Sequence, residues 1–378
     1  MSSQIQLIPR SGIEGLAVYE PGRPLEEVAR AHGLAPGALV KLASNENSLG
    51  PSPKAIEAMH TAASKMHLYP DGGAFYLRKA LSEKLGVAPN MLLFGNGSNE
   101  LIEFLGHVFL EPGTNLVMSQ AAFIIYKLVG DAFGAETRMA PMRNFTHDLE
   151  AMAKLIDEDT RLVYVANPNN PTGTRVDNEQ LQDFLHQVPP HVLVVLDEAY
   201  VELLPPDEQP DSIQWVLDGH PVLILRTFSK TYGLAGLRIG YALGSPTVLS
   251  LLNKFRQPFN VNAMALAAAL AAIADDEHVV QTRALVREGL GFFERECFQL
   301  NLDTVPSSAN FLLIRTGDGR RHFEAMQELG VIARPMDGYG LPEWLRITVG
   351  TKTENRRAIE VLKQVLAAHP ADAEGVGS

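Results

Sequence analysis

The chain has little cysteine, no long apolar run and fewer basic than acidic residues. Its single cysteine, Cys297, excludes a disulfide within the chain and is expected to be a core residue in a reducing compartment. No apolar run reaches the roughly 20 residues that a membrane-spanning helix needs, and the start has no signal-peptide pattern. A net charge of −12 disfavours nucleic acid and anionic membranes as main partners. We therefore expect a cytoplasmic protein that binds neither.

The residues that are present suit a large globular protein. The chain has 378 residues, of which 46% are hydrophobic and 20% charged, and this length favours two domains. Residues 1–40 are rich in proline and glycine and predict an N-terminal arm that joins the smaller domain, with one short helix at 25–32. Residues 371–378 are polar and predict a flexible tail.

Residues 41–260 predict the larger domain, because short apolar runs alternate there with amphipathic helices. Several runs are unbroken, which is typical of strands covered by helices on both faces. The pattern predicts an α/β fold with a mostly parallel sheet. The expected strands are 91–94, 115–118, 162–166, 192–196, 222–225 and 239–242, and the expected helices are 74–85, 100–110, 124–132 and 178–186.

Residues 261–370 predict a smaller α+β domain, joined to the larger one near residue 260. An alanine-rich helix begins near Asn262, and a long helix is expected at 279–298. Strands at 311–315 and 345–348 and a closing helix at 352–368 complete this domain.

Lys230 is the most informative residue of the chain. It follows the apolar strand at 222–225 and stands in a glycine-rich loop, where α/β enzymes present reactive groups. A lysine whose pKa is lowered by its neighbours can form an imine with an aldehyde. Taken alone, however, such a lysine is more often a surface cation.

Two more strand ends carry polar side chains. Asp197 ends the run at 192–196, where a buried carboxylate can hold a pyridine nitrogen protonated or simply cap a turn. Asn167 begins a turn at 167–173 that contains two prolines and favours a rigid backbone, including a cis-proline. This turn either only reverses the chain or holds an asparagine amide against a ligand.

A third strand end has the composition of an anion site. Gly97, Ser98 and Asn99 precede a helix, where free backbone amides can bind phosphate. The signal is weak alone, because many such turns merely cap a helix. Ser229 and Arg238, on either side of Lys230, could complete a phosphate site.

Taken together, these segments resemble a known family. The stretches KLASNEN, YPDGG, GNGSNE, NPNNPTG, LDEAY and RTFSKTYGLAGLRIGY resemble those of fold-type I aminotransferases, which use pyridoxal phosphate, and most closely the histidinol-phosphate aminotransferase branch. The resemblance extends from about Tyr19 to the closing helix. It implies a large domain on a mostly parallel seven-stranded sheet, a smaller α+β domain and a homodimer with active sites at the subunit interface.

The resemblance also implies roles for particular residues. Lys230 would bond to the cofactor aldehyde and move the proton of the reaction, and Asp197 would pair with the ring nitrogen. Asn167 and Tyr200 would bind the ring hydroxyl. The cofactor phosphate would be bound by Gly97, Ser98, Asn99, Ser229 and Arg238, with Tyr69 from the partner subunit. Phe123 would stack on the ring, and Tyr19, Asn47, Arg334 and Arg346 would bind substrate.

Two departures from the family pattern are small. Phe123 replaces the usual stacking tyrosine, and Ser48 replaces the proline that usually follows Asn-Glu-Asn. No metal is implied.

The implied reaction interconverts histidinol phosphate and 2-oxoglutarate with imidazole acetol phosphate and glutamate. An aminotransferase for phenylalanine, tyrosine or tryptophan is the main alternative, and dual activity is compatible with the motifs. Two arginines, Arg334 and Arg346, favour the phosphate ester. A phosphothreonine-type decarboxylase and a non-catalytic regulator that senses pyridoxal phosphate are more remote alternatives.

Overall fold

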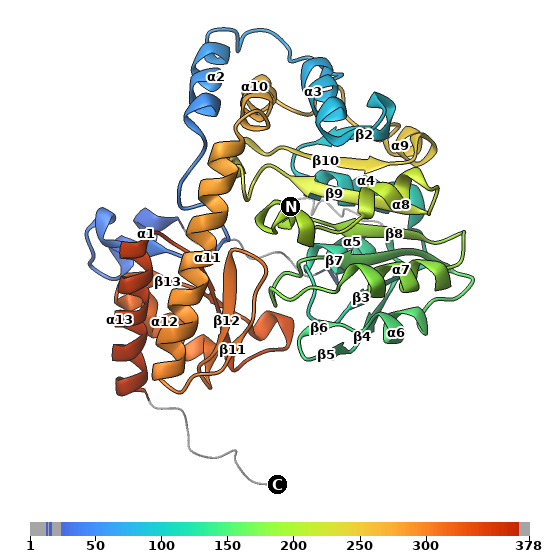
Figure 1. Ribbon diagram of the computed structural model, residues 1–378. Helices are drawn as coiled ribbons and strands as arrows, with labels where there is room; N and C mark the ends of the chain where they lie inside the picture. The colour runs from blue at the N-terminus through green and yellow to red at the C-terminus, as the bar shows by residue number, and fades with distance from the viewer. Residues whose placement is uncertain (1–12, 14, 17–23, 370–378) are drawn as a thin grey trace, which may run out of the picture.

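The computed structural model describes residues 13, 15–16 and 24–369 of the chain. Tyr19 lies outside the described residues. Figure 1 shows a large sheet flanked by helices and, beside it, a smaller unit built from the two ends of the described chain.

The large sheet has seven strands in the order β2-β10-β9-β8-β7-β3-β4. β10 is antiparallel to both of its neighbours, and every other pair is parallel. This confirms the expected α/β fold. The strands are β2 (Leu92–Gly95), β3 (Asn115–Ser119), β4 (Glu136–Ala140), β7 (Thr160–Ala166), β8 (Leu193–Asp197), β9 (Val222–Thr227) and β10 (Gly240–Gly244).

Helices cover both faces of this sheet. Successive residues of β8 alternate between two cores: Val194 and Leu196 pack in one, and Leu193 and Val195 in the other. This alternation explains the unbroken apolar runs. The first core includes residues of α2 (Pro53–Ala63), α3 (Phe75–Leu85), α6 (Leu149–Ala153), α7 (Asn178–Gln187), α8 (Ser212–Leu217) and α10 (Ala263–Ala272), and the second those of α4 (Ser98–Phe109), α5 (Ile125–Phe133) and α9 (Pro246–Leu252).

All six strands predicted for the large sheet form. Five of them extend one or two residues further toward the carboxyl end than expected, and β7 ends at Ala166 as expected. The strand β4 was missed. It lies at the sheet edge, and only its last residue, Ala140, is fully buried, so it has no unbroken apolar run. The helix α2 was also missed, because Pro53 at its start reads as a breaker although proline is tolerated in a first turn.

The smaller unit has an antiparallel sheet in the order β11-β12-β15-β14 and a short parallel pair, β1 with β13. Its core includes Phe293, Leu345, Leu362 and Cys297, so the cysteine is a core residue as expected. Its elements are α1 (Leu25–Ala31), β1 (Val40–Lys41), α11 (Asp276–Gln299), β11 (Thr304–Val305), β12 (Phe311–Arg315), α12 (Gly319–Glu328), β13 (Val331–Ile332), β14 (Arg334–Pro335), β15 (Trp344–Thr348) and α13 (Lys352–Ala368).

The helix α11 connects the two units. Val279, near its start, packs in the core of the large sheet, whereas Phe293 packs in the core of the smaller unit. Figure 1 shows α11 running from beside α10 down to the smaller sheet. The domain boundary near residue 260 stays a prediction.

Short elements complete the description. A hairpin of β5 (Met142–Arg143) and β6 (Thr146–His147) forms a separate two-stranded sheet. The 3-10 helices are η1 (Pro36–Ala38), η2 (Pro89–Met91), η3 (Val201–Leu203), η4 (Pro206–Glu208), η5 (Ala235–Leu237) and η6 (Asp337–Tyr339). Within the described part of the chain, no helix combines the length and the apolarity needed to cross a membrane.

Candidate active site

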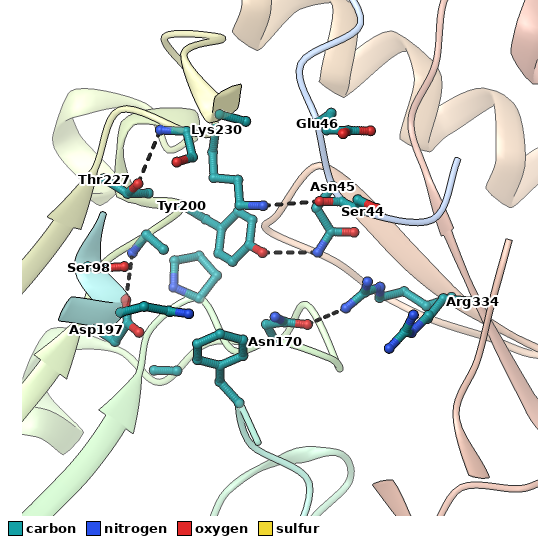
Figure 2. Close-up of a pocket in the computed structure, with 18 of the residues that line it drawn as sticks. Ser44, Asn45, Glu46, Ser98, Asn170, Asp197, Tyr200, Thr227, Lys230 and Arg334 are labelled. Atoms are coloured by element: carbon teal, nitrogen blue, oxygen red, sulfur yellow. Dashed lines mark hydrogen bonds between the residues drawn. The ribbon is translucent and has the colours of Figure 1, made fainter. Parts of the chain in front are cut away.

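A cavity of about 440 Å³ lies between the two units, at the carboxyl ends of the parallel strands. Ala166, Asp197 and Thr227 end β7, β8 and β9, and all three line it. Parallel strands end at the same edge of a sheet, so polar residues at separate points of the sequence meet there. Figure 2 shows Lys230, Tyr200 and Asp197 facing this space.

Lys230 lines the cavity three residues after the end of β9. Its Nζ donates a hydrogen bond of 3.1 Å to the backbone oxygen of Ser44 and lies 5.8 Å from the centre of the Tyr200 ring. Burial, together with the nearby guanidinium of Arg346, lowers the pKa of Lys230 to about 8. A neutral amine, able to act as nucleophile or base, is therefore accessible near neutral pH.

Asp197 is buried at the end of β8. Its Oδ2 accepts a 2.6 Å hydrogen bond from the hydroxyl of Tyr126, and its Oδ1 accepts one of 3.2 Å from the amide of Ala199. Burial raises the pKa of Asp197 to about 6. Neither donor carries a positive charge, so a protonated ring nitrogen in the cavity would offset the cost of burying this carboxylate.

Tyr126 is a residue that sequence reasoning missed. It is fully buried on α5, and its ring stacks on that of Tyr164 with centroids 4.3 Å apart. In the sequence it looks like an ordinary core residue of an amphipathic helix, and only the fold brings its hydroxyl to Asp197.

The start of α4 forms an anion-binding corner. Ser98 and Asn99 line the cavity, and the residue before the helix, Gly97, provides no side-chain cap for the first free amides. A Cβ on Gly97, whose φ is +79°, would lie 2.7 Å from Nη2 of Arg238. The missing side chain therefore lets a guanidinium approach the helix start. Ser229 and Thr227 also line this end, and the donor set fits a phosphate.

Tyr200 lies next to the end of the Lys230 side chain, as Figure 2 shows. Its hydroxyl accepts a 3.0 Å hydrogen bond from Nδ2 of Asn45, whose Oδ1 accepts one of 3.1 Å from the hydroxyl of Thr348. Burial raises the pKa of Tyr200 to about 12, so the phenol keeps its proton. Phe123 also lines the cavity, as a ring-stacking residue would.

The structure does not bring Asn167 to the cavity. Its amide is used within its own loop, since Nδ2 donates to the backbone oxygen of Val176 at 3.1 Å and Oδ1 accepts from the amide of Val176 at 3.0 Å. The asparagine that lines the cavity is Asn170, whose Oδ1 accepts a hydrogen bond from Arg346. The peptide bonds before Pro168 and Pro171 are both cis. The turn motif was correct, but the asparagine chosen from it was not the one that faces the cavity.

Asn47 also lies outside this cavity. Its Nδ2 donates to the backbone oxygen of Thr231 at 2.9 Å and to the hydroxyl of Thr282 at 3.1 Å, so it joins the loop after Lys230 to α11. Asn45, for which no role was predicted, lines the cavity instead of Asn47. Tyr69 lies outside the cavity too, with 83% of its surface exposed and its ring stacked on Phe259 at 4.8 Å. Its expected contact with a partner subunit stays a prediction.

Arg334 and Arg346 occupy one end of the cavity. They are directly paired across β14 and β15. Arg346 is held in place: Nη2 donates to the backbone oxygen of Ala43 at 2.8 Å, and its guanidinium carbon lies 5.1 Å from the centre of the Phe311 ring. Among the described residues, no side-chain hydrogen bond or ion pair of Arg334 is found. Among those same residues, no cluster of three or more His, Cys, Asp or Glu could hold a metal.

Comparison with known proteins agrees with this geometry. The family model described as aminotransferase class I and II matches residues 38–362. A histidinol-phosphate aminotransferase of Akkermansia muciniphila is 48% identical over 352 residues, or 93% of this chain and 96% of the relative. Histidinol-phosphate aminotransferase 2 of Pseudomonas aeruginosa is 45% identical over 366 residues, or 97% and 99%.

Solved structures are also similar. The histidinol-phosphate aminotransferase from Sinorhizobium meliloti, in complex with pyridoxal-5'-phosphate, has a TM-score of 0.87 and 27% identity, covering 97% of this chain and 100% of that chain. An aspartate aminotransferase from Thermus thermophilus with maleate has a TM-score of 0.83 and 22% identity, covering 96% and 100%, and shares the fold.

Proposed function

Because this chain belongs to the family of class I and II aminotransferases, we propose that it uses pyridoxal phosphate to interconvert histidinol phosphate and 2-oxoglutarate with imidazole acetol phosphate and glutamate. The observation that carries the choice of substrate is the pair Arg334 and Arg346 at one end of the cavity. Similarity to histidinol-phosphate aminotransferases over nearly the whole chain supports the same choice.

The cavity offers two separate anion sites. One is the corner of Gly97, Ser98 and Arg238, which suits the cofactor phosphate, and the other is the arginine pair. Two guanidinium groups bind a dianionic phosphate ester through charge-assisted hydrogen bonds. They act locally, so the net charge of −12 does not oppose such a ligand. Figure 2 shows Ser98 and Arg334 at opposite ends of the site, with Tyr200 between them.

The residues between these sites would carry the chemistry. When bound, the cofactor supplies an aldehyde that carries the amino group and a ring that withdraws electrons. Nζ of Lys230 would take the proton from the substrate α-carbon and return it, which its lowered pKa favours. Asp197 would hold the ring nitrogen protonated, and Tyr126 would orient this carboxylate through its 2.6 Å hydrogen bond.

Other side chains would orient the ring. Tyr200 and Asn170 line the cavity and are proposed to hydrogen-bond the ring hydroxyl, with Asn170 in place of Asn167. Phe123 would pack on the ring face. Asn45 would position the Tyr200 hydroxyl, to which it is already bonded.

A homodimer is part of the proposal. Tyr69, Phe75 and Tyr76 are 83%, 63% and 70% exposed, an unusual amount of aromatic surface to leave in water. A second copy of the chain would cover this surface and bring Tyr69 to the neighbouring cofactor phosphate. The single buried cysteine suits a reducing compartment, and we propose a cytoplasmic location.

The substrate assignment is tested by a half-reaction on the cofactor-loaded protein. Histidinol phosphate, histidinol and phenylalanine are offered separately without a keto acid, and conversion of the cofactor is followed by its absorbance. We expect histidinol phosphate to react with the highest kcat/KM, because only it carries the dianion that the arginine pair suits. A preference for phenylalanine would instead identify an aromatic aminotransferase, and a protein without a cofactor absorbance band would contradict the role of Lys230.

A further inference from the structure

The hairpin of β5 and β6 reaches from the large unit to the smaller one. Its tip, Asn144 and Phe145, has φ angles of 50° and 62°. The Phe145 ring lies 4.9 Å from the ring of Trp344 on β15, centroid to centroid, in an edge-on arrangement. Phe145 packs on an apolar cluster, here called the β15 cluster, whose buried members are Val305, Leu313, Met336 and Trp344. All four buried members belong to the smaller unit.

The β15 cluster supports the arginine end of the cavity. Trp344 and Arg346 are two residues apart on β15 and therefore share a face of the sheet. Leu313 of the cluster is the direct neighbour of Arg346 on β12. Tyr339, which packs on the cluster, also lines the cavity. The position of the cluster therefore sets the position of the side chains that would bind the substrate phosphate.

The base of the hairpin is fixed to the large sheet. His147 is buried, and burial lowers its pKa to about 4, so the ring is neutral. Its Nε2 donates to the backbone oxygen of Ala166 at 2.8 Å, and its Nδ1 accepts from the hydroxyl of Ser119 at 2.7 Å. Ser119 and Ala166 end β3 and β7, so the hairpin is tied directly to the edge that carries the site.

The hairpin is also tied to the loop that presents Asn170. The hydroxyl of Thr174, four residues after Asn170, donates to the backbone oxygen of Phe145 at 2.7 Å. Asn170 in turn bonds Arg346. Phe145 thus connects the loop that presents Asn170 to the strand that carries Arg346, since its backbone oxygen is bonded to Thr174 and its ring packs on Trp344.

We propose that Phe145 is a positioning residue for substrate binding: by resting on Trp344, it sets the distance between β15, with Arg346, and the loop with Asn170. The inference rests on the proposed function and deepens it. Loss of the ring frees β15 to shift, so Arg346 no longer meets the substrate phosphate at the right place. The proposed contacts to the cofactor phosphate come from Ser98, Asn99, Ser229 and Arg238, all in the large unit, and they are unaffected.

The test compares Phe145→Ala with Phe145→Leu and with a matched control, Phe133→Ala. Phe133 is also a half-buried phenylalanine of the large unit, but it packs against His107 on α4. For each purified holoenzyme, kcat and KM are measured with histidinol phosphate and with histidinol, and the Kd of the cofactor is measured by titration. We expect Phe145→Ala to raise KM for histidinol phosphate about tenfold, with KM for histidinol and the cofactor Kd unchanged. Phe145→Leu, which keeps an apolar contact, restores most of the affinity.

Several outcomes overturn the inference. One is an unchanged KM for histidinol phosphate in Phe145→Ala, and another is an equal rise for both amines. An equal effect of Phe133→Ala would show that lost stability alone is responsible. A wild-type enzyme that does not prefer histidinol phosphate to histidinol contradicts the proposed function instead. The inference is then judged on the amine that the wild type does prefer, and an unaltered KM for that amine in Phe145→Ala overturns it.

Discussion

At the scale of single residues, burial shifts the pKa values of Lys230 and Asp197, the two principal ionisable groups of the site, in opposite directions. Burial lowers the pKa of Lys230 to about 8 and raises that of Asp197 to about 6, because in both cases it disfavours the charged form. The lysine is thereby brought toward the neutral state that a base needs. The carboxylate, by contrast, gains from any cation placed next to it, and a protonated ring nitrogen would be such a cation.

The lowered pKa of Lys230 predicts that Lys230→Met stabilises the cofactor-free protein by an amount that depends on pH. Below pH 8 the wild-type lysine is charged in the folded and unfolded states, and the cost of burying that charge is fully present. Between about 8 and the ordinary value of 10.5, the folded protein binds fewer protons than the unfolded one, so wild-type stability rises with pH. We expect the advantage of Lys230→Met to be largest below pH 8 and to shrink above it.

Urea unfolding of both proteins at pH 7 and pH 9.5 checks this expectation. A constant difference between them at the two pH values would show that Lys230 titrates at its ordinary pKa. The variant should also have no transaminase activity.

At the scale of elements, the start of α4 shows how a missing side chain makes a site. Gly97 has a positive φ and no Cβ, so the helix begins with free amides and with Arg238 packed against them. Arg238 itself has a φ of 55°, a left-handed conformation that is unfavourable for a residue with a side chain. The left-handed backbone conformations of Gly97 and Arg238 together place the start of α4 next to the guanidinium of Arg238.

Gly97→Ala should therefore lose cofactor affinity, and Gly113→Ala is its control. Both glycines have positive φ, but a Cβ at Gly113 meets nothing within 4 Å. Both substitutions should cost about 1–3 kcal/mol of stability through backbone strain. Only Gly97→Ala should also weaken cofactor binding, by about tenfold or more, because the new methyl group displaces Arg238. Titration of the cofactor-free proteins with pyridoxal phosphate measures this, and equal losses of affinity in both would refute a phosphate role for this corner.

At the scale of the whole molecule, the site exists only where the two units meet. Asn45 bonds Thr348, Asn170 bonds Arg346, and Tyr200 packs edge-on against Phe311 with ring centroids 5.4 Å apart. Each pair joins residues that are far apart in sequence. The relative position of the two units therefore decides whether a substrate held by the smaller unit reaches Lys230.

The exposed aromatic surface predicts that Tyr76→Glu weakens the dimer. A charge placed in a buried interface should raise the dissociation constant about 100-fold, because desolvation of the carboxylate is not offset by a partner. Phe298→Glu, at a residue that is 82% exposed on α11, is the matched control and should leave the dimer intact. Sedimentation velocity over a range of concentrations distinguishes the two, and a Tyr76→Glu protein that stays dimeric would place the interface elsewhere.

Local pattern alone was enough to predict most elements of the fold. The apolar runs at 162–166, 192–196 and 222–225 became central strands because helices cover both of their faces. The edge strand β4, half in water, carries no such signal. The carboxyl ends of parallel strands meet at one edge of a sheet, and the polar residues noted after separate strands, Lys230, Asp197 and Arg238, do line one cavity.

The sequence by itself thus determined the layered fold, the edge of the sheet that carries the site and the residue types that gather there, because these follow from periodicity and from strand direction. Only the tertiary structure decided which asparagine of a nearby pair faces the cavity. In the first pair it is Asn170 and not Asn167, and in the second it is Asn45 and not Asn47. It also brought the hydroxyl of Tyr126 to Asp197 and the ring of Phe145 to Trp344. These choices depend on side-chain direction and on contacts between segments distant in sequence, and no local pattern encodes either.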